Sequence, residues 1–319
     1  MIRYIGHDDN SRAFAAAIQS GRLHHGWILA GPKGLGKAAF ARNAAKMLVD
    51  PAGQYSDQIE RGIHPDVITV ERPPKDPPKE GEAIDPDAEK KRNIPIAEIR
   101  ALQARMTTRP GLSDKRAVII DAAEDMETSS ANALLKSLEE PPAGTYFFLI
   151  SHMSARLLPT IRSRCQTLRF DPLDAKQMEA ALRGAMPDLD TESLLLLAQA
   201  GAGSPGQAIE YAGLEMEELE KNMRSIIDTG DPGNGIRASM AAKLAVKAAQ
   251  IKYEAFLRRA PQMIAHYAAQ MDAAQAENAI KAWEDANILA ARATGVSLEK
   301  QSVVLQMGSL LASLQTHKG

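Results

Sequence analysis

The sequence predicts a parallel α/β domain followed by two helical domains. In the first half, short apolar runs of strand length alternate with amphipathic segments of helical period, which is typical of a parallel sheet covered on both faces. After Phe170 this alternation stops and only helical patterns follow. The 319 residues exceed what one core comfortably serves. We therefore expect an α/β domain over 1–170, a small helical domain over 171–212 and an all-helical domain over 213–319.

Each expected strand is a short apolar run, and each expected helix repeats apolar residues every three to four positions. The strands cover Trp27–Ala30, Asp66–Val70, Arg116–Asp121 and Tyr146–Ser151. The helices cover Asn10–Ser20, Ala38–Leu48, Ile96–Met106, Thr128–Glu139, Asp174–Met186, Asp190–Gln199, a stretch from Gln207 onward, Ala238–Arg259, Ala273–Thr294 and Leu298–Gln315. Residues 72–91 are rich in Pro, Lys, Glu and Asp, and this composition predicts a mobile surface insertion.

Composition excludes several classes of protein. The net charge of −2 gives no global basic field that would recruit nucleic acid or a membrane. The single cysteine, Cys165, excludes a disulfide framework and a multi-cysteine zinc site. The first residues lack the apolar core of a signal peptide, and no segment reaches membrane-spanning length. We expect a soluble protein of the cytoplasm.

A glycine-rich segment between the first strand and its helix predicts a phosphate-binding loop. The segment Gly31-Pro-Lys-Gly-Leu-Gly-Lys37 matches G-x-x-x-x-G-K, the loop whose backbone N–H groups surround phosphate oxygens. Ala38 stands where a serine or threonine hydroxyl normally binds Mg²⁺. The phosphate cradle is thus predicted without its metal ligand. Its candidate residues are Gly31, Lys33, Gly34, Gly36 and Lys37.

Asp121 is the candidate for a vestigial magnesium site. It ends a buried strand that we expect beside the strand of the phosphate loop, where nucleotide hydrolases place a metal-coordinating aspartate. Ala122 follows in place of a carboxylate that would polarise water. Glu124 and Asp125 come later and are expected to point elsewhere. The alternative is that Asp121 is only a helix cap or a solvated strand end. No bound metal is predicted.

Arg164 is the candidate catalytic residue. It lies in Ser163-Arg-Cys165, just past the last expected strand, where a side chain can project out of its own subunit. A planar guanidinium there can stabilise charge on a neighbour's γ-phosphate. The alternative is a surface salt bridge, which is the ordinary role of an exposed arginine. Cys165 is most simply a small buried residue.

Four segments of the sequence are informative when they occur together in this order. They are His25-Gly-Trp-Ile-Leu-Ala-Gly-Pro-Lys-Gly-Leu-Gly-Lys37, Gly62-Ile-His-Pro-Asp66, Asn132-Ala-Leu-Leu-Lys-Ser-Leu-Glu-Glu-Pro-Pro142 and Thr160-Ile-Arg-Ser-Arg-Cys165. Together they resemble the bacterial DNA polymerase III clamp-loader subunits of the AAA+ superfamily, and within them the delta-prime type. The resemblance implies an AAA+ domain with a helical lid and a C-terminal helical collar. It also implies an ATPase-deficient member of a nucleotidyltransferase holoenzyme, whose Arg164 reaches the nucleotide of an adjacent motor subunit.

The resemblance also implies partners and further losses. The partners are gamma/tau motor subunits and the delta subunit, with the sliding clamp and primed DNA contacted through the complex, and no membrane. Gln207 stands in the lid motif where motor subunits carry a phosphate-sensing arginine. Many relatives bind zinc through four cysteines, but residues 50–62 contain none, so no zinc is expected and packing alone must hold this region. No cofactor is required, and weak ATP or ADP binding stays open.

Two other functions compete with this interpretation. An active ATPase of the gamma/tau type would be indicated by a hydroxyl at 38, a carboxylate at 122 and an arginine at 207, and none of these is present. A DNA-binding adaptor would be indicated by a basic stretch with interleaved aromatic residues, which the sequence lacks.

Overall fold

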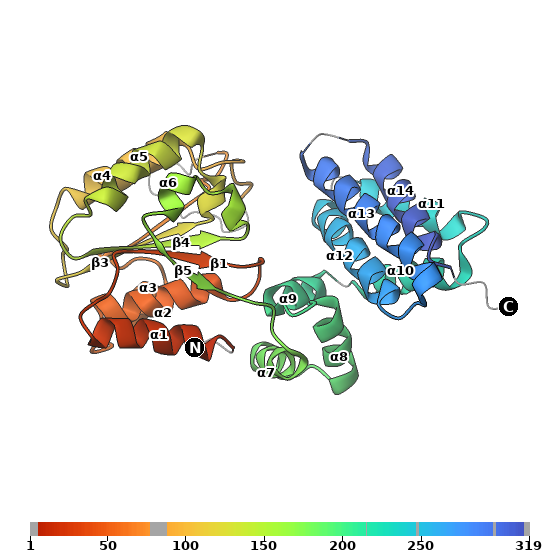
Figure 1. Ribbon diagram of the computed structural model, residues 1–319, viewed down its shortest axis with the longest axis horizontal. Helices are drawn as coiled ribbons and strands as arrows, with labels where there is room; N and C mark the ends of the chain where they lie inside the picture. Colours follow the sequence, from red (N-terminus) through yellow and green to blue (C-terminus); the bar gives the residue numbers. More distant parts are fainter. Residues whose placement is uncertain (1–5, 77–87, 215, 247–248, 296–297, 316–319) are drawn as a thin grey trace. The chain divides into compact units, whose positions relative to one another are not determined.

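The computed structural model describes residues 6–76, 88–214, 216–246, 249–295 and 298–315 (Figure 1). The chain divides into two compact units. One comprises Met1–Leu194 with Gly203–Gly206, and the other comprises Leu195–Ala202 with Gln207–Gly319. The expected boundaries near residues 170 and 212 stay predictions, and each unit is described by itself below.

The first unit is built on a five-stranded parallel sheet. The strands are β1 (Gly26–Ala30), β2 (Val67–Glu71), β3 (Arg116–Asp121), β4 (Thr145–Ser151) and β5 (Gln166–Arg169), in the order β2-β3-β4-β1-β5. The prediction that the strand of Asp121 lies beside that of the phosphate loop was wrong, because β4 separates β3 from β1. All these strands except β5 are apolar enough for the interior of a sheet, so apolar content does not fix their order.

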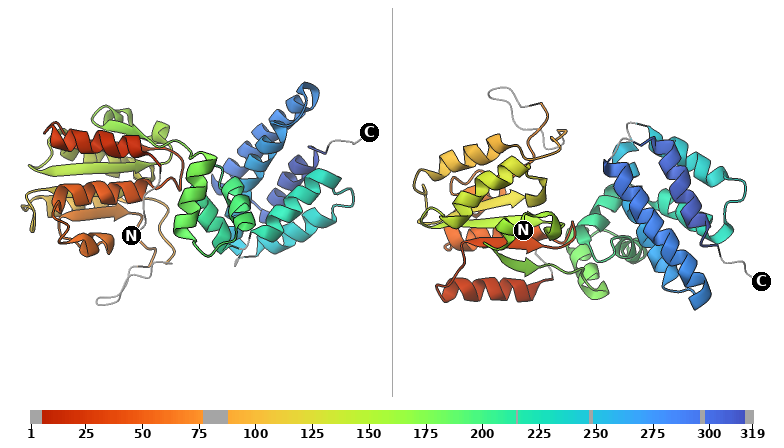
Figure 2. Two further views of the ribbon diagram at one scale, coloured as in Figure 1. Left: turned by 90° about the horizontal axis from the view of Figure 1, so that it is seen from below. Right: turned by 45° about the horizontal axis from the view of Figure 1, so that its top comes forward.

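Helices cover both faces of this sheet (Figures 1 and 2). One face carries α1 (Asp8–Gln19), α2 (Lys37–Val49) and α3 (Ser56–Glu60), and the other carries α4 (Ile96–Met106), α5 (Thr128–Glu139) and α6 (Pro159–Arg162). Side chains alternate between the faces along β1. Trp27 and Leu29 join Phe14 and Phe40 in the core under α1 and α2, whereas Ile28 joins the core under α4 and α5. Short 3-10 turns follow β3 and β4, η1 (Ala123–Asp125) and η2 (Ser154–Arg156).

Two features of the first unit differ from expectation. β5 was not predicted, because Gln-Thr-Leu-Arg has no apolar run and lies exposed at the edge of the sheet. Of the predicted insertion at 72–91, residues 77–87 lie outside the described residues. Its described ends pair with each other: the Lys75 N–H donates to the Glu89 carbonyl at 2.7 Å, and the Lys91 N–H donates to the Pro73 carbonyl at 2.7 Å.

Helices follow the sheet, beginning with α7 (Ala175–Ala185), α8 (Thr191–Ala200) and α9 (Pro205–Gly213). The start of α7 is fixed by a capping box. The Asp174 carboxylate accepts from the Gln177 N–H at 2.8 Å, and the Gln177 side chain accepts from the Asp174 N–H at 3.1 Å. This reciprocal pair satisfies two amides that the first turn of the helix leaves without a partner.

The second unit has a helical core. Its longer helices are α10 (Glu217–Thr229), α11 (Gly235–Ala245), α12 (Gln250–Ala268), α13 (Ala273–Gly295) and α14 (Lys300–Ala312), which bury Met223, Phe256, Ile264, Met307 and Leu311 together. The single helix predicted over 238–259 was wrong. α11 ends at Ala245, and α12 continues through Pro261, so the burial of this face of the helix, which includes Ala260 and Met263, offsets the proline's cost. No helix in the described ranges has the length and apolar content needed to cross a bilayer.

Candidate functional site

The predicted phosphate-binding loop connects β1 to α2. The strand ends at Ala30 and the helix begins at Lys37, so the expected strand–loop–helix context is confirmed. Gly34 and Gly36 have φ of 83° and 80°, values that glycine adopts without strain. A Cβ on Gly31 would lie 2.1 Å from the Phe170 carbonyl oxygen. These three glycines are therefore required by the shape of the loop.

The first amides of α2 have no intrahelical partners, because the helix begins within the loop. Their N–H groups and the positive end of the helix dipole favour an anion at this place. Ala38 adds only a methyl group in the first turn of the helix, so the side chain that would hold a metal is missing. The loop can bind phosphate through its backbone, without a hydroxyl for Mg²⁺.

Lys37 is buried, with only 3% of its surface exposed. Its Nζ donates to the carbonyl oxygens of Gly31 and Pro32, each at 2.6 Å. Burial lowers the pKa of Lys37 to about 8, although the carboxylates of Asp121 and Glu124 act in the opposite direction. The lysine is thus folded back onto its own loop, and desolvation disfavours its charged form.

Asp121 lies at the same carboxyl edge of the sheet, at the end of β3. Burial raises its pKa, and the nearby carboxylate of Glu71, its register partner on β2, raises it further. The ammonium of Lys37 acts in the opposite direction. Within the described ranges, no three His, Cys, Asp or Glu side chains come together as a metal site would require.

Glu124 was predicted to point away from this site, and that prediction was wrong. One carboxylate oxygen accepts from the backbone N–H groups of His152 at 2.7 Å and Met153 at 3.2 Å, directly after β4. Its charge also acts on the pKa of Lys37. Because η1 turns the chain back after β3, Glu124 reaches the end of the neighbouring strand.

The end of β4 contributes polar groups that sequence reasoning missed. Ser151 Oγ, His152 Nδ1 and Glu124 Oε2 are buried and have no hydrogen-bond partner among the described residues. Burial lowers the pKa of His152 to about 4, and the charge of Lys37 lowers it too, so the imidazole is neutral at pH 7. Ser151 also accepts the Gly31 N–H through its carbonyl at 3.1 Å. The polar pair Ser151-His152, where a buried strand ends, was the signal available in the sequence.

The predicted lid motif contacts the phosphate loop directly. Ser204 Oγ donates to the Lys33 carbonyl at 2.9 Å, and the Gly206 N–H donates to the Gly34 carbonyl at 2.9 Å. A Cβ on Gly206 would lie 2.7 Å from Gly34 Cα. Gln207, the next residue, accepts from the Gln262 side chain at 3.4 Å. As an uncharged amide, it cannot supply the positive charge of an arginine.

Arg164 lies at the end of the sheet where the parallel strands begin, whereas the phosphate loop lies where they end. β5 runs parallel to β1 with Gln166 opposite Trp27, so the Ser-Arg-Cys turn sits beside the amino end of β1. A Cβ on Gly26 would lie 3.0 Å from Cys165 Sγ and 3.2 Å from the Arg164 carbonyl oxygen. The phosphate loop starts at the carboxyl end of the same strand, so Arg164 and its own cradle occupy opposite edges. Cys165 is half-buried, and burial raises its pKa to about 12.

The Arg164 guanidinium is held by contacts within its own subunit. It forms an ion pair with Glu139, the last residue of α5, and its Nη1 donates to the Thr160 carbonyl at 2.9 Å. Its side chain is 34% exposed and that of Glu139 is 48% exposed. The surface salt bridge that we considered as the alternative role is therefore present.

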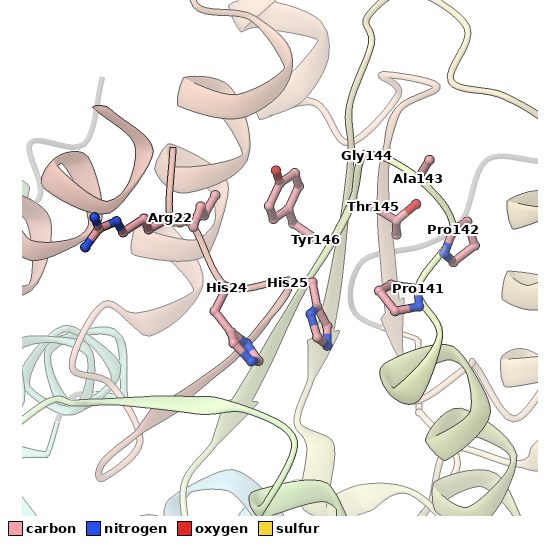
Figure 3. Close-up of a pocket in the computed structure, with 10 residues that line it drawn as sticks. Arg22, His24, His25, Pro141, Pro142, Ala143, Gly144, Thr145 and Tyr146 are labelled. Carbon is pink, nitrogen blue, oxygen red and sulfur yellow. The ribbon is translucent and has the colours of Figure 1, made fainter. Parts of the chain in front are cut away.

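The carboxyl end of α5 is anchored to the segment before β1. A ring nitrogen of His25, Nε2, lies 2.8 Å from the Leu138 carbonyl oxygen, and the His24 and His25 rings stack at 4.4 Å. These histidines and Pro141 face a recess of about 460 Å³ at the amino edge of the sheet (Figure 3). Arg22–His25 and Pro141–Tyr146 line it. The histidines thus help to link the segment before β1 to the end of α5.

Two carboxylates, Asp50 and Asp66, organise the segment around residues 50–62, which contains no cysteine. Asp50 accepts from the N–H groups of Gln54 and Tyr55, both at 2.8 Å. Asp66 is fully buried and accepts from the N–H groups of Gly111 at 2.6 Å and Leu112 at 2.7 Å. The expectation that packing alone holds this region was incomplete, because side-chain-to-backbone hydrogen bonds also fix it.

Known proteins similar to this chain include two bacterial proteins named DNA polymerase III subunit delta'. One, from Pseudomonas aeruginosa, is 35% identical over 61% of this chain and 57% of its own length. The other, from Bacillus subtilis, is 36% identical over 52% of this chain and 48% of its own length. A DNA polymerase III subunit gamma from Buchnera aphidicola is 28% identical over 71% of this chain and 61% of its own. The chain thus spans about half the length of the relatives it matches.

Among solved structures, a DNA polymerase III gamma subunit-related protein from Thermotoga maritima aligns over 94% of this chain and 98% of its own, with a TM-score of 0.45 and 17% identity. That resemblance is too loose to bear on function. The family model described as DNA polymerase III, delta subunit, matches residues 6–174, which include the phosphate loop, Asp121 and Arg164. On this match, the chain belongs to the DNA polymerase III delta-subunit family.

Proposed function

We propose that this chain is an ATPase-deficient subunit of the delta-prime type in the clamp loader of DNA polymerase III. It supports loading of the sliding clamp on primed DNA and donates Arg164 to the nucleotide of a neighbouring motor subunit. The observation that carries the proposal is the place of Arg164, at the edge of the sheet opposite its own phosphate loop. An arginine there can act only on a nucleotide bound by another subunit.

The chemistry of Arg164 suits this role. A guanidinium has five N–H donors in a planar fork that matches phosphate oxygens, and it stays charged at every relevant pH. Charge develops on the γ-phosphate oxygens during phosphoryl transfer, and an arginine supplied in trans stabilises it. A third of the Arg164 side chain is exposed, which leaves a neighbour room to approach.

The chain's own cradle is proposed to bind nucleotide weakly without hydrolysing it. The positive-φ glycines, the first amides of α2 and the buried Lys37 fit a phosphate group. Ser151 Oγ, which is buried near the loop with no hydrogen-bond partner in the described part of the chain, also suits a polar ligand. Ala38 and Ala122 do not fit a catalytic Mg²⁺ site, because neither can bind a metal or polarise water. The subunit therefore requires no cofactor for its own part.

The proposed partners are gamma/tau motor subunits and a delta subunit in the cytoplasm, with the clamp and primed DNA reached through the complex. The similarity to proteins named subunit delta' and subunit gamma supports this setting. Large apolar side chains exposed on α13, Ile280, Trp283 and Ile288, support the second unit as the collar that holds the assembly. The competing candidate is an active gamma/tau-type ATPase, and the similarity to a protein named subunit gamma is the observation in its favour.

The decisive experiment compares reconstituted complexes that differ only in this subunit. We expect Arg164→Ala to leave assembly intact and to lower ATP turnover by a fraction, because only the adjacent site loses its arginine. Arg164→Lys should not restore the rate fully, since an ammonium lacks the planar fork. Arg162→Ala, an exposed arginine on α6, is the matched control and should behave as wild type. Equal rates for Arg164→Ala and wild type would refute the trans role.

The same preparation separates the competing enzyme. The isolated subunit should release no phosphate above the level of a Lys37→Ala variant. Turnover on the order of 1 s⁻¹ that disappears in Lys37→Ala would instead identify an active ATPase.

A further inference from the structure

The Arg164 side chain has a defined position before any neighbour is present. Its two terminal nitrogens are engaged on different elements: Nη2 pairs with the Glu139 carboxylate at the end of α5, and Nη1 donates to the Thr160 carbonyl in α6. A guanidinium carries five N–H groups, so these contacts leave donors for another acceptor. The guanidinium is held in place and keeps N–H donors for a further hydrogen bond.

Glu139 itself is carried on a rigid support. It is the last residue of α5, whose Leu134 and Leu138 are fully buried under the sheet. The contact between His25 and the Leu138 carbonyl ties this end of the helix to the start of β1, and Pro141 prevents the helix from continuing. The carboxyl end of a helix is negative, which adds to the attraction for Arg164.

We propose that Glu139 is a positioning residue that presents Arg164 to the nucleotide of the neighbouring subunit. This inference rests on the proposed trans role of Arg164. A free arginine samples many rotamers and loses that freedom when it binds phosphate. Holding it in one arrangement beforehand removes part of this loss from the step in which the neighbour's phosphate is engaged.

Two effects of Glu139 oppose each other, and exposure decides between them. The carboxylate offsets part of the arginine's charge, which would weaken its attraction for phosphate. Both side chains are a third to a half exposed, so water already screens that loss. The positions of the two acceptors do not depend on charge, because α5 carries the Glu139 carboxylate and α6 carries the Thr160 carbonyl. Removing Glu139 should therefore slow the neighbour's reaction.

The test uses the assembled complex with Glu139→Ala, Glu139→Asp and Glu140→Ala variants, each also measured for thermal stability and assembly. Glu140 is the exposed neighbouring carboxylate, which makes it the matched control. We expect Glu139→Ala to lower the kcat of the Arg164-dependent turnover about threefold, a typical effect of one exposed charge pair, with KM for ATP unchanged. Glu139→Asp should have a rate between those of Glu139→Ala and wild type, and Glu140→Ala should have the wild-type rate.

Arg164→Ala completes the design, alone and combined with Glu139→Ala. If Glu139 acts through Arg164, its removal should cause no further loss in the Arg164→Ala complex. Wild-type turnover for Glu139→Ala, while Arg164→Ala is slow, would overturn this inference and leave the proposed function standing. Faster turnover than wild type, or an additive loss in the double variant, would also overturn it. Wild-type turnover for Arg164→Ala would overturn the proposed function and this inference together.

Discussion

Arg164 and Glu139 form an ion pair that joins the Ser-Arg-Cys turn to the carboxyl end of α5. These two segments carry two of the sequence motifs that identify the chain, and they are separated by all of β4. The pair therefore gives a physical reason for the two motifs to occur together: one supplies the arginine and the other fixes where it lies.

Lys37 should make the protein less stable near neutral pH than an uncharged residue would. Burial lowers its folded pKa to about 8, below the ordinary value of 10.5, so the unfolded chain binds more protons between these values. Stability of the wild type should therefore rise with pH through this window. Lys37→Met should raise the free energy of unfolding at pH 7, by on the order of 1–3 kcal/mol, and this advantage should shrink above pH 8.

Urea unfolding at pH 7 to 10 measures this effect. A Trp283→Phe background leaves Trp27, beneath α1 and α2, as the only tryptophan. Lys33→Met is the matched control, because Lys33 is an exposed lysine of the same loop. A Lys37→Met variant no more stable than Lys33→Met at pH 7 would show that the buried ammonium carries no cost.

Gly206→Ala should weaken the contact between the lid segment and the phosphate loop. The added Cβ would approach Gly34 Cα to 2.7 Å, and the backbone on both sides leaves no flexible side chain to move. Overpacking of this kind costs about 1–3 kcal/mol. Gly213→Ala, on the same helix α9, meets nothing within 4 Å and should change stability by less than about 1 kcal/mol. Equal unfolding curves for the two variants would contradict this packing.

Cys165 should react slowly with alkylating reagents in the folded protein. The thiolate is the reactive form, and burial raises the pKa of this thiol to about 12. At pH 8 the native protein should therefore be modified by iodoacetamide far more slowly than the urea-unfolded protein. Mass spectrometry reads this directly, because the chain has a single cysteine. Comparable rates in the two states would mean that the Ser-Arg-Cys turn opens readily.

Elements with a clear pattern and a clear stop were predicted with accurate bounds. The strand 116–121 and the helices 96–106 and 128–139 match β3, α4 and α5, because charge or proline interrupts each pattern at its end. β5 was missed because an exposed edge strand needs no apolar run. The placing of β3 beside β1 was also wrong, since pairing depends on which apolar strands meet and not on the composition of any one of them.

The candidate site also has features that the sequence predicted and contacts that it did not. The glycines of the phosphate loop and the lost hydroxyl at Ala38 are local features, so the sequence alone reveals them. The contacts of Glu124 with the amides after β4, and of Arg164 with Glu139, join residues distant along the chain. Only the folded sheet brings them together, which is why Glu124 was expected to point elsewhere and the pair of Arg164 with Glu139 was not predicted.

β1 separates the Ser-Arg-Cys turn from the phosphate loop in this domain. Its five residues, Gly26 to Ala30, span about 13 Å, with the arginine turn at one end and the phosphate loop at the other. If the arginine acts in trans, each subunit meets one neighbour at the end that carries the arginine, its donor end, and another at the end that carries the phosphate loop, its acceptor end. Such subunits associate head to tail, so the assembly has a direction. A member that keeps its donor end but has lost the metal ligand at its acceptor end would mark where the row of working sites stops.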